Sequence, residues 1–345
     1  MFVDCKIGAE HKSKMDNLRL NKSQRLLDFA MKDSYFAAII HDLLDYGHRV
    51  RYSPFGGAGA YTPTYLSTEP LDSTLKQQQF SNGFWAMSER GLMICKIRLS
   101  MFAGEDANKH SFLHEVMHFY QDSLGIYFTP LKEKGRLPVV LDAKSHIVSL
   151  LFCEAWAQIE AIRTCWALKD KGDASGWDGL LKSREWSALA LFYDADLESG
   201  FDEARAAANC FKEWYRGSHR VMYEKHALDI FETNVKIFSA DVKGLDQGAI
   251  AASLRCAGVD DIIARIPAKE RPKFMSRIEW DDTMLDPQDK SIREKLRKIE
   301  ARYGRADNND VSDIRCGSAP YIWKRLRNAE IKDSELPPPP PPSED

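Results

Sequence analysis

Hydrophobic and polar positions follow a helical period between residues 107 and 124. Apolar side chains recur there every three or four positions, the spacing that places them on one face of an α-helix. Asp106, Asn108 and Ser111 are candidate N-caps, and Gly125 is a candidate stop, so the pattern predicts one helix with clear ends. The apolar residues of this stripe are Phe112, Leu113, Val116, Phe119 and Tyr120.

Just before this helix, the pattern of hydrophobic and polar positions is that of short β-strands. Residues 83–87 and 92–97 are rich in apolar and aromatic side chains, and a polar turn sequence at residues 88–91 separates them. This order predicts a β-hairpin over residues 84–98. The preceding residues 52–83 contain several prolines and glycines, and we expect them to form a loop.

Periodic segments elsewhere in the chain are also helical, so the fold class is α+β and mostly helical. They include a long apolar helix after the loop near Pro138, which Gly172 is expected to end. The expected helical segments are residues 21–50 (one or two helices), 142–170, 173–200 (a short helical connection), 201–239, 247–265 and 288–303.

Changes in composition divide the 345 residues into four regions. An N-terminal region of helix and loop (1–82) precedes a core domain (83–240), which is followed by a C-terminal helical region (241–334). Residues 335–345 contain six consecutive prolines, which predict a solvated polyproline-II tail. The alternative for this tail is a ligand for a domain with an aromatic groove.

Composition and charge describe an ordinary globular protein. Hydrophobic residues make up 44% and charged residues 29% of the chain, and the net charge of −3 gives no general attraction to nucleic acid or anionic membranes. Seven cysteines form no C-x-x-C pair, which favours a reducing compartment. Neither a signal peptide nor an apolar run long enough to span a membrane is evident. We expect a cytoplasmic protein, with export by a dedicated secretion system left open.

The helix of residues 107–124 carries the pattern His-Glu-x-x-His. His114 and His118 are one helical turn apart, about 5–6 Å between Cβ atoms, and two imidazoles at that distance can share one zinc ion. Glu115 can reach a metal-bound water without binding the metal, which is the general-base position of a zinc hydrolase. The alternative is a surface helix with two solvated histidines.

A catalytic zinc site needs a third protein ligand. Glu154 stands alone in an apolar stretch of the helix at 142–170, where a buried carboxylate is costly unless a cation pairs with it. It is the preferred candidate, and its alternative is a solvent-facing position beside Gln158. His146 and Glu160 are competing ligands. A capping or surface role suffices for His146, and Glu160 can pair with Arg163.

These residues resemble the gluzincin pattern of zinc metallopeptidases, in which a Glu on a second helix completes the site of the His-Glu-x-x-His helix. More narrowly, residues 83–230 are similar to an uncharacterised bacterial metallopeptidase domain family. The features shared with it are His-Glu-x-x-His-x-x-Gln, then Glu-Ala-x-Ala, then an Ala-rich helix with Phe211, Trp214 and Tyr223.

The resemblance implies a zincin-like core with a small β-hairpin or sheet before the His-bearing helix. It implies zinc as the cofactor, and His114, His118 and Glu154 as its ligands. Glu115 would be the base and Tyr223 the donor to the developing oxyanion, although a Tyr at this spacing is also typical of a core. Other candidate donors on the later helical region are His219, Tyr215 and His226.

The chain departs from the better-known zincin patterns at several positions. Gln158 stands where a thermolysin-like signature has Asp, so we expect the ligands to be oriented by another group, with Asp122 as the candidate beside His118. Gln121 and Leu124 occupy the positions of the Gly and the third His of metzincins, which excludes that pattern.

The sequence therefore predicts a zinc-dependent metallopeptidase that acts on peptide or protein substrates. Zinc would lower the pKa of a bound water, and Glu115 would take its proton and return it to the leaving nitrogen. Two alternatives stay open: a zincin-shaped binding or regulatory module with a structural or vestigial metal site, and a non-peptide amidase. Glu115 argues against a purely structural site, because such a site needs no base.

Overall fold

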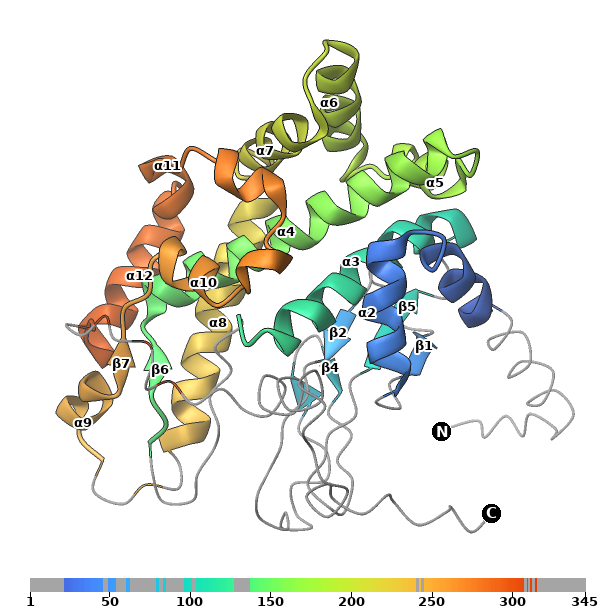
Figure 1. The fold of residues 1–345 in the computed structure, drawn as a ribbon. Coiled ribbons are helices and arrows are strands. Elements are labelled where there is room, and N and C mark those ends of the chain that lie inside the picture. Colours follow the sequence, from blue (N-terminus) through green and yellow to red (C-terminus); the bar gives the residue numbers. More distant parts are fainter. Residues whose placement is uncertain are drawn as a thin grey trace, which may run out of the picture.

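The structure is a computed structural model, and the part of the chain that it describes is mostly helical, as the sequence predicts (Figure 1). None of the described helices is long and apolar enough to cross a membrane. The described residues are 22–45, 49–53, 60–62, 79–80, 83–84, 96–100, 104–126, 137–239, 242, 245–306, 309, 311 and 314.

Three helices form the centre of the fold: α3 (Glu105–Ser123), α4 (Ala143–Asp170) and α8 (His219–Ser239). α4 packs against α3 along one side and against α8 along another (Figure 1). Gly125 follows α3 with φ 72°, a left-handed conformation that residues with a Cβ rarely adopt. Both α3 and α4 lie within two residues of the helices that the sequence predicts.

α4 is buried on nearly every face, which explains its continuous apolar sequence. A helix that is hydrophobic all round belongs inside a protein, and α4 is covered by α3, α5, α7 and α8. Its largest fully buried side chains are Trp156 and Phe152. Asp142 begins the helix, because its carboxylate accepts a hydrogen bond from the backbone N–H of Ser145 at 2.8 Å.

Shorter helices surround this centre. α2 (Ser34–Asp45) packs on α3, and α5 (Ser175–Leu181) packs on both α3 and α4. The contact between α5 and α3 is close enough to require Gly179, since a Cβ at that position would lie 2.3 Å from the Asp106 backbone. α6 (Ser187–Glu198) and α7 (Glu203–Trp214) follow.

The helical region expected at residues 201–239 is in fact two helices, α7 and α8, because a turn at residues 215–218 separates them. The segment expected as one short connection at 173–200 likewise contains both α5 and α6. In each case a short polar run marks the break, residues 216–220 at the start of α8 and residues 182–185 before α6, and the sequence prediction did not use it.

C-terminal elements pack against α4 and α8, at the opposite end of the molecule from α2 (Figure 1). The short strand β7 pairs in parallel with β6 (Val140–Leu141), which directly precedes α4. The C-terminal elements are α9 (Gln247–Ala252), β7 (Leu254–Arg255), α10 (Val259–Ala264), two 3-10 turns (Ala268–Glu270 and Lys273–Arg277), α11 (Asp282–Leu285) and α12 (Lys290–Tyr303).

The strands pair differently from the hairpin expected at residues 84–98. β5 (Lys96–Ser100) pairs in parallel with β1 and antiparallel with β2, whereas β4 (Gly83–Phe84) pairs with β3. Residues 85–95 lie outside the described part of the chain. Strands this short carry too few alternating positions to specify a partner. The partner strands are β1 (Arg49–Ser53), β2 (Ala60–Thr62) and β3 (Gln79–Phe80), of which β2 and β3 fall in the expected loop.

Candidate metal centre

The histidines of α3 and a glutamate of α4 meet where the two helices pack together. The Nε2 atoms of His114 and His118 are 2.9 Å apart, and one Glu154 oxygen, Oε2, lies 3.3 Å from the first and 3.4 Å from the second. Among the described residues, these three form the one group of His, Cys, Asp and Glu side chains close enough to hold a metal ion together.

The separation of these atoms fits a tetrahedral metal ion. Ligand atoms at zinc bond lengths of about 2.0–2.2 Å lie about 3.3–3.6 Å apart at the corners of a tetrahedron. The two distances to Glu154 fall in this range, and the distance between the two nitrogens is only slightly shorter. Two imidazoles and one carboxylate are also a ligand set of catalytic zinc sites, which keep a fourth position for water.

Neither competing ligand takes part in this cluster. The Glu160 carboxylate accepts a hydrogen bond from Arg163 Nη1 at 2.8 Å and another from Trp156 Nε1 at 3.4 Å. His146 lies two turns before Glu154, and burial together with the nearby His226 lowers its pKa to about 4. Glu154 is therefore the carboxylate that faces the two imidazoles.

The charges of the cluster show that it favours a cation. Burial by itself raises the pKa of Glu154, but the charge of His118 and hydrogen bonds from both imidazoles hold this pKa below its ordinary value. Burial by itself lowers the pKa of His118, but Glu154, Glu115 and Gln121 raise it to about 9. Burial and then His118 lower the pKa of His114. The pair of imidazoles thus holds one proton, which a metal ion would displace on binding.

Gln121 orients the imidazole of His118. Its Oε1 lies 2.9 Å from His118 Nδ1, and its Nε2 donates to the backbone carbonyl of Cys153 at 2.8 Å. Because the Gln121 amide group is held by this second bond, its oxygen accepts the Nδ1 proton of His118. A metal ion that displaces the remaining proton would then find the Nε2 lone pair of His118 on the side of Glu154, as a metal ligand requires.

Gln158 occupies the corresponding place beside His114. Its Nε2 lies 2.8 Å from His110 Nε2, and its side chain is among the groups that raise the pKa of His114. Burial lowers the pKa of His110 to about 3, so its ring is neutral and its Nε2 accepts the Gln158 proton. The Gln158 oxygen and His114 Nδ1 are both buried without a hydrogen-bond partner among the described residues.

Neither glutamine is predicted from the sequence as an orienting group. The predicted group is Asp122, whose side chain lies outside what the structure describes, and Gln158 is expected to leave this role to another group. The positions of the two glutamines along their helices could have indicated this role, since Gln158 follows Glu154 by four residues and Gln121 follows His118 by three. Both positions point back toward the metal side of their helix.

Replacing either glutamine by leucine should weaken metal binding by roughly 10- to 100-fold, because the imidazole that it orients loses its fixed tautomer and direction. Competition with a chromophoric chelator measures this affinity. Ser149→Ala is the matched control, since it removes a buried hydrogen bond of α4 to the Ile126 carbonyl and leaves the cluster intact. Equal metal affinity in Gln121→Leu, Gln158→Leu and the control would contradict the orienting role.

Glu115 lies beside the cluster and is only 4% exposed. Its charge is one of the contributions that raise the pKa of His118, so its carboxylate is close to that ring. It is not one of the three converging ligand groups. A buried carboxylate next to a metal position, but outside the ligand set, is placed to exchange a proton there.

α8 contributes Tyr223 from the other side of the cluster. Burial raises the pKa of Tyr223 well above its ordinary value, and the carboxylates of Glu154, Glu185 and Glu115 raise it further. The phenol also interacts with the Glu154 side chain as a hydrogen-bond partner. It therefore keeps its proton at neutral pH and can donate a hydrogen bond beside the metal position.

His219, one turn before Tyr223, is held between two tryptophans. Its ring centroid lies 4.8 Å from that of Trp186 and 4.7 Å from that of Trp214. Gly217 makes room for it, since a Cβ there would lie 2.1 Å from the imidazole. The ring interacts with the Trp214 backbone carbonyl, and Nε2 is buried without a partner among the described residues. Burial lowers the pKa of this imidazole.

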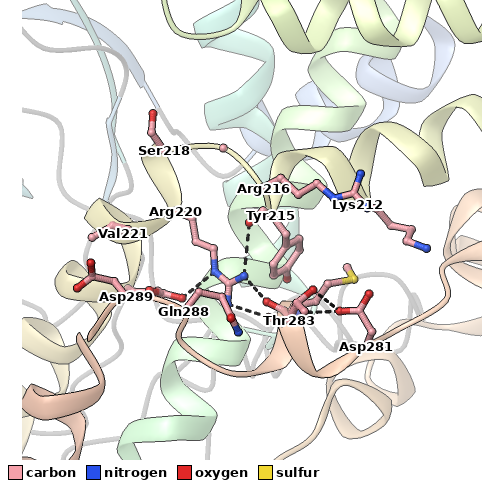
Figure 2. A pocket seen from close by; sticks show the side chains of 13 residues that line it. Lys212, Tyr215, Arg216, Ser218, Arg220, Val221, Asp281, Thr283, Gln288 and Asp289 are labelled. Carbon is pink, nitrogen blue, oxygen red and sulfur yellow. Dashed lines mark hydrogen bonds and ion pairs between the residues drawn. The ribbon is translucent and has the colours of Figure 1, made fainter. Parts of the chain in front are cut away.

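A pocket of about 400 Å³ lies at the start of α8, beside the segment around α11 (Figure 2). Tyr215 and Arg220 line it, and the guanidinium of Arg220 donates to the Glu224 carboxylate at 2.7 Å. The other Arg220 donors bond the backbone carbonyls of Tyr215, Thr283, Met284 and Asp286.

All five N–H groups of Arg220 are thus used within the protein, and this residue joins the start of α8 to the segment around α11. The pocket includes none of the residues of the metal cluster.

The candidate oxyanion donors lie in different places. Tyr215 lines this pocket, away from the cluster, whereas Tyr223 lies against Glu154. His226 is near both His146 and Glu154.

Comparison with known proteins gives one family match. A model described as "Putative metallopeptidase family (DUF6782)" matches residues 90–235. The matched segment contains all of α3 and α4 and most of α8, and so includes the whole metal cluster. No curated protein and no solved structure matches the chain significantly. The match supports a metallopeptidase, a class of hydrolase that depends on a metal ion.

Proposed function

We propose that the protein is a zinc-dependent metallopeptidase of the gluzincin type that hydrolyses peptide or protein amide bonds. The observation that carries this proposal is the convergence of His114 and His118 from α3 with Glu154 from α4, with Glu115 buried beside them. The family match over the same helices supports it. In this proposal α3 and α4 are the two helices of a zincin-like core.

The roles of the protein groups follow from their chemistry. A zinc ion bound by the two imidazoles and Glu154 would supply a water of lowered pKa and polarise the substrate carbonyl. Glu115 accepts a proton at this position and delivers it to the leaving nitrogen. Gln121 keeps the His118 imidazole in the tautomer that turns Nε2 toward the metal position. Gln158 lies beside His114 and raises its pKa.

Tyr223 is the best candidate for the group that stabilises the developing oxyanion. Its phenol is protonated at neutral pH and lies beside Glu154. His219 is less suited, because its Nε2 is buried and burial lowers the pKa of the ring. Tyr215 lies in the turn before α8 and lines the pocket there.

The direct test of the function is metal content combined with peptide hydrolysis. Protein purified without added zinc should contain about one zinc ion per chain and cleave a generic peptide mixture. Treatment with a chelator should stop cleavage, and one equivalent of zinc should restore it. Zinc without cleavage of any peptide would favour a binding module, and cleavage of small amides alone would favour a non-peptide amidase.

Tyr223→Phe should reduce kcat by roughly 10²- to 10³-fold, the usual effect of removing one oxyanion donor. Zinc content and the melting temperature should stay close to those of the wild type, because the ring remains in place. Steady-state kinetics on a cleaved peptide measures the effect. Tyr215→Phe removes a phenol that lines the pocket at the start of α8, and it should leave kcat unchanged. Equal rates in the two variants would remove Tyr223 from the mechanism.

A further inference from the structure

α12 presents a basic face to solvent. Its apolar residues recur every three or four positions and are buried where the helix packs against α4, α8 and α9. The positions on its other side are exposed, and most of them carry a positive charge. A cationic face of this kind attracts anionic partners. The exposed cations of α12 are Lys290, Arg293, Arg297, Lys298 and Arg302.

Neighbouring carboxylates neutralise little of this charge. Arg297 and Lys298 form no hydrogen bond or ion pair within the described part of the chain. Arg293 donates to two backbone carbonyls, which are neutral acceptors and leave its charge in place. Glu294 is the exposed carboxylate of the same helix, and it lies 4.0 Å from Lys290. The exposed face of α12 therefore keeps an excess of positive charge.

α8 lies beside α12 and extends this face. Lys295 of α12 joins the two helices, because its ammonium group pairs with the carboxylates of Asp229 and Glu232 of α8. Lys225 lies one turn before Asp229 and Lys236 one turn after Glu232, so these side chains share one side of α8. Both lysines are exposed and have no ion pair with the residues that the structure describes. These two lysines and the five exposed cations of α12 form the basic surface.

The width of α8 separates the basic surface from the candidate metal centre. α8 packs its inner side against α4, which carries Glu154, whereas Lys225 and Lys236 are on its outer side. A helix with its side chains is about 10–12 Å across, and Lys236 lies about 20 Å beyond Tyr223 along the axis. An extended chain needs roughly six to ten residues to cover 20–30 Å. The basic surface can therefore contact a substrate only at a distance from the scissile bond.

We propose that the basic surface is an exosite that binds an acidic segment of a protein substrate. This proposal rests on the proposed function and names the class of substrate. Arginine side chains bind carboxylates through paired, charge-assisted hydrogen bonds, and α12 exposes three of them. The carboxylates of Asp229, Glu232 and Glu294 lie among the cations. They would repel a uniform polyanion such as nucleic acid or an anionic lipid surface, whereas a polypeptide can place basic side chains opposite them.

The test uses the zinc-loaded full-length protein and a peptide that it cleaves. This peptide is extended at either end by a flexible spacer of about eight residues, followed by a run of Glu or a run of Gln. We expect kcat/KM to be on the order of tenfold higher for the Glu run at one of the two ends, through a lower KM and with kcat unchanged. The preference should fall to near one in about 1 M salt, where charges more than about 3 Å apart are screened.

The double variant Arg297→Glu with Lys298→Glu should lose this preference and cleave the unextended peptide at the wild-type rate. The matched control is Lys171→Glu with Lys182→Glu, which changes the net charge equally at two exposed lysines just after α4 and α5, on the opposite side of the molecule from α12 (Figure 1). Its preference should equal that of the wild type. No preference in the wild type, or an equal preference in the two double variants, would overturn the exosite and leave the metallopeptidase function standing.

A binding measurement tests the exosite without turnover. A labelled peptide with only the spacer and the Glu run should bind the wild type on the order of tenfold more tightly than its Gln counterpart in fluorescence anisotropy. Arg297→Glu with Lys298→Glu should bind the two equally. If instead a DNA oligonucleotide or vesicles containing phosphatidylserine bound through these two residues, with no preference for the Glu peptide, the partner would be that polyanion and the proposal would be overturned. Selective binding of the Glu run without cleavage of any peptide would overturn the metallopeptidase function alone.

Discussion

Glu115→Gln should abolish peptide hydrolysis while the protein stays folded and keeps its zinc. The amide cannot accept a proton, and loss of a general acid–base group typically lowers the rate by 10²- to 10⁴-fold. The side chain is buried next to His118 but is not one of the converging ligand groups, so metal binding should continue. Steady-state kinetics measures the loss of hydrolysis, metal analysis measures the retained zinc, and the melting temperature shows that the protein stays folded.

The matched control for this prediction is Glu105→Gln on the same helix. Glu105 pairs with Arg25 at 2.9 Å on the surface of the protein, and exposed pairs of this kind contribute about 0–1 kcal/mol. The control should therefore retain full turnover. Unchanged hydrolysis in Glu115→Gln would exclude the general-base role, and loss of zinc in that variant would show that Glu115 helps to hold the metal.

Glu154→Ala should remove most of the zinc affinity and, with it, the stability that zinc supplies. The variant retains two ligands, and the protonated His118 loses the carboxylate that holds it. A ligand that binds only the folded state stabilises it by RT ln(1 + [L]/Kd), or about 2.7 kcal/mol at 100 times Kd. We expect the melting temperature of the wild type to rise on addition of zinc, and that of the variant to stay constant.

Glu160→Gln provides the comparison on the same helix. Its carboxylate is buried and paired with Arg163 and Trp156, so the variant should be less stable with or without zinc. The increase in melting temperature caused by zinc should nevertheless equal that of the wild type. If Glu154→Ala bound zinc as tightly as the wild type, Glu154 would not be a ligand, and the gluzincin assignment would fail.

Local pattern determined the helices that carry the cluster. The three-and-four spacing of apolar residues predicts α3 and α4 to within two residues of their ends. The same period places His114 and His118 on one face, because side chains four apart lie one above the other on a helix. The sequence favours Glu154 as the third ligand for an energetic reason, because a carboxylate within a helix that is buried all round needs a cationic partner.

Local pattern did not determine the strand partners or the ends of the later helices. β4 and β5 pair with other strands than each other, since two to five residues do not encode a register. α7 and α8 are separated by the turn at residues 215–218, where the polar residues and Gly217 were not predicted to end a helix. Residues 335–345 lie outside the described part of the chain, so the prediction of a polyproline-II tail stays a prediction.

By itself, the sequence determined which residues could bind a metal, because spacing along a helix and the cost of a buried charge are local properties. Only the tertiary structure decided which groups surround them. Gln121 is held beside His118 by the Cys153 carbonyl because α3 packs on α4. Tyr223 rather than Tyr215 lies beside Glu154, since Tyr215 is in the turn before α8 and lines the pocket there. Glu154 meets His118 across 36 positions of the chain, and contacts of that range depend on how whole helices pack.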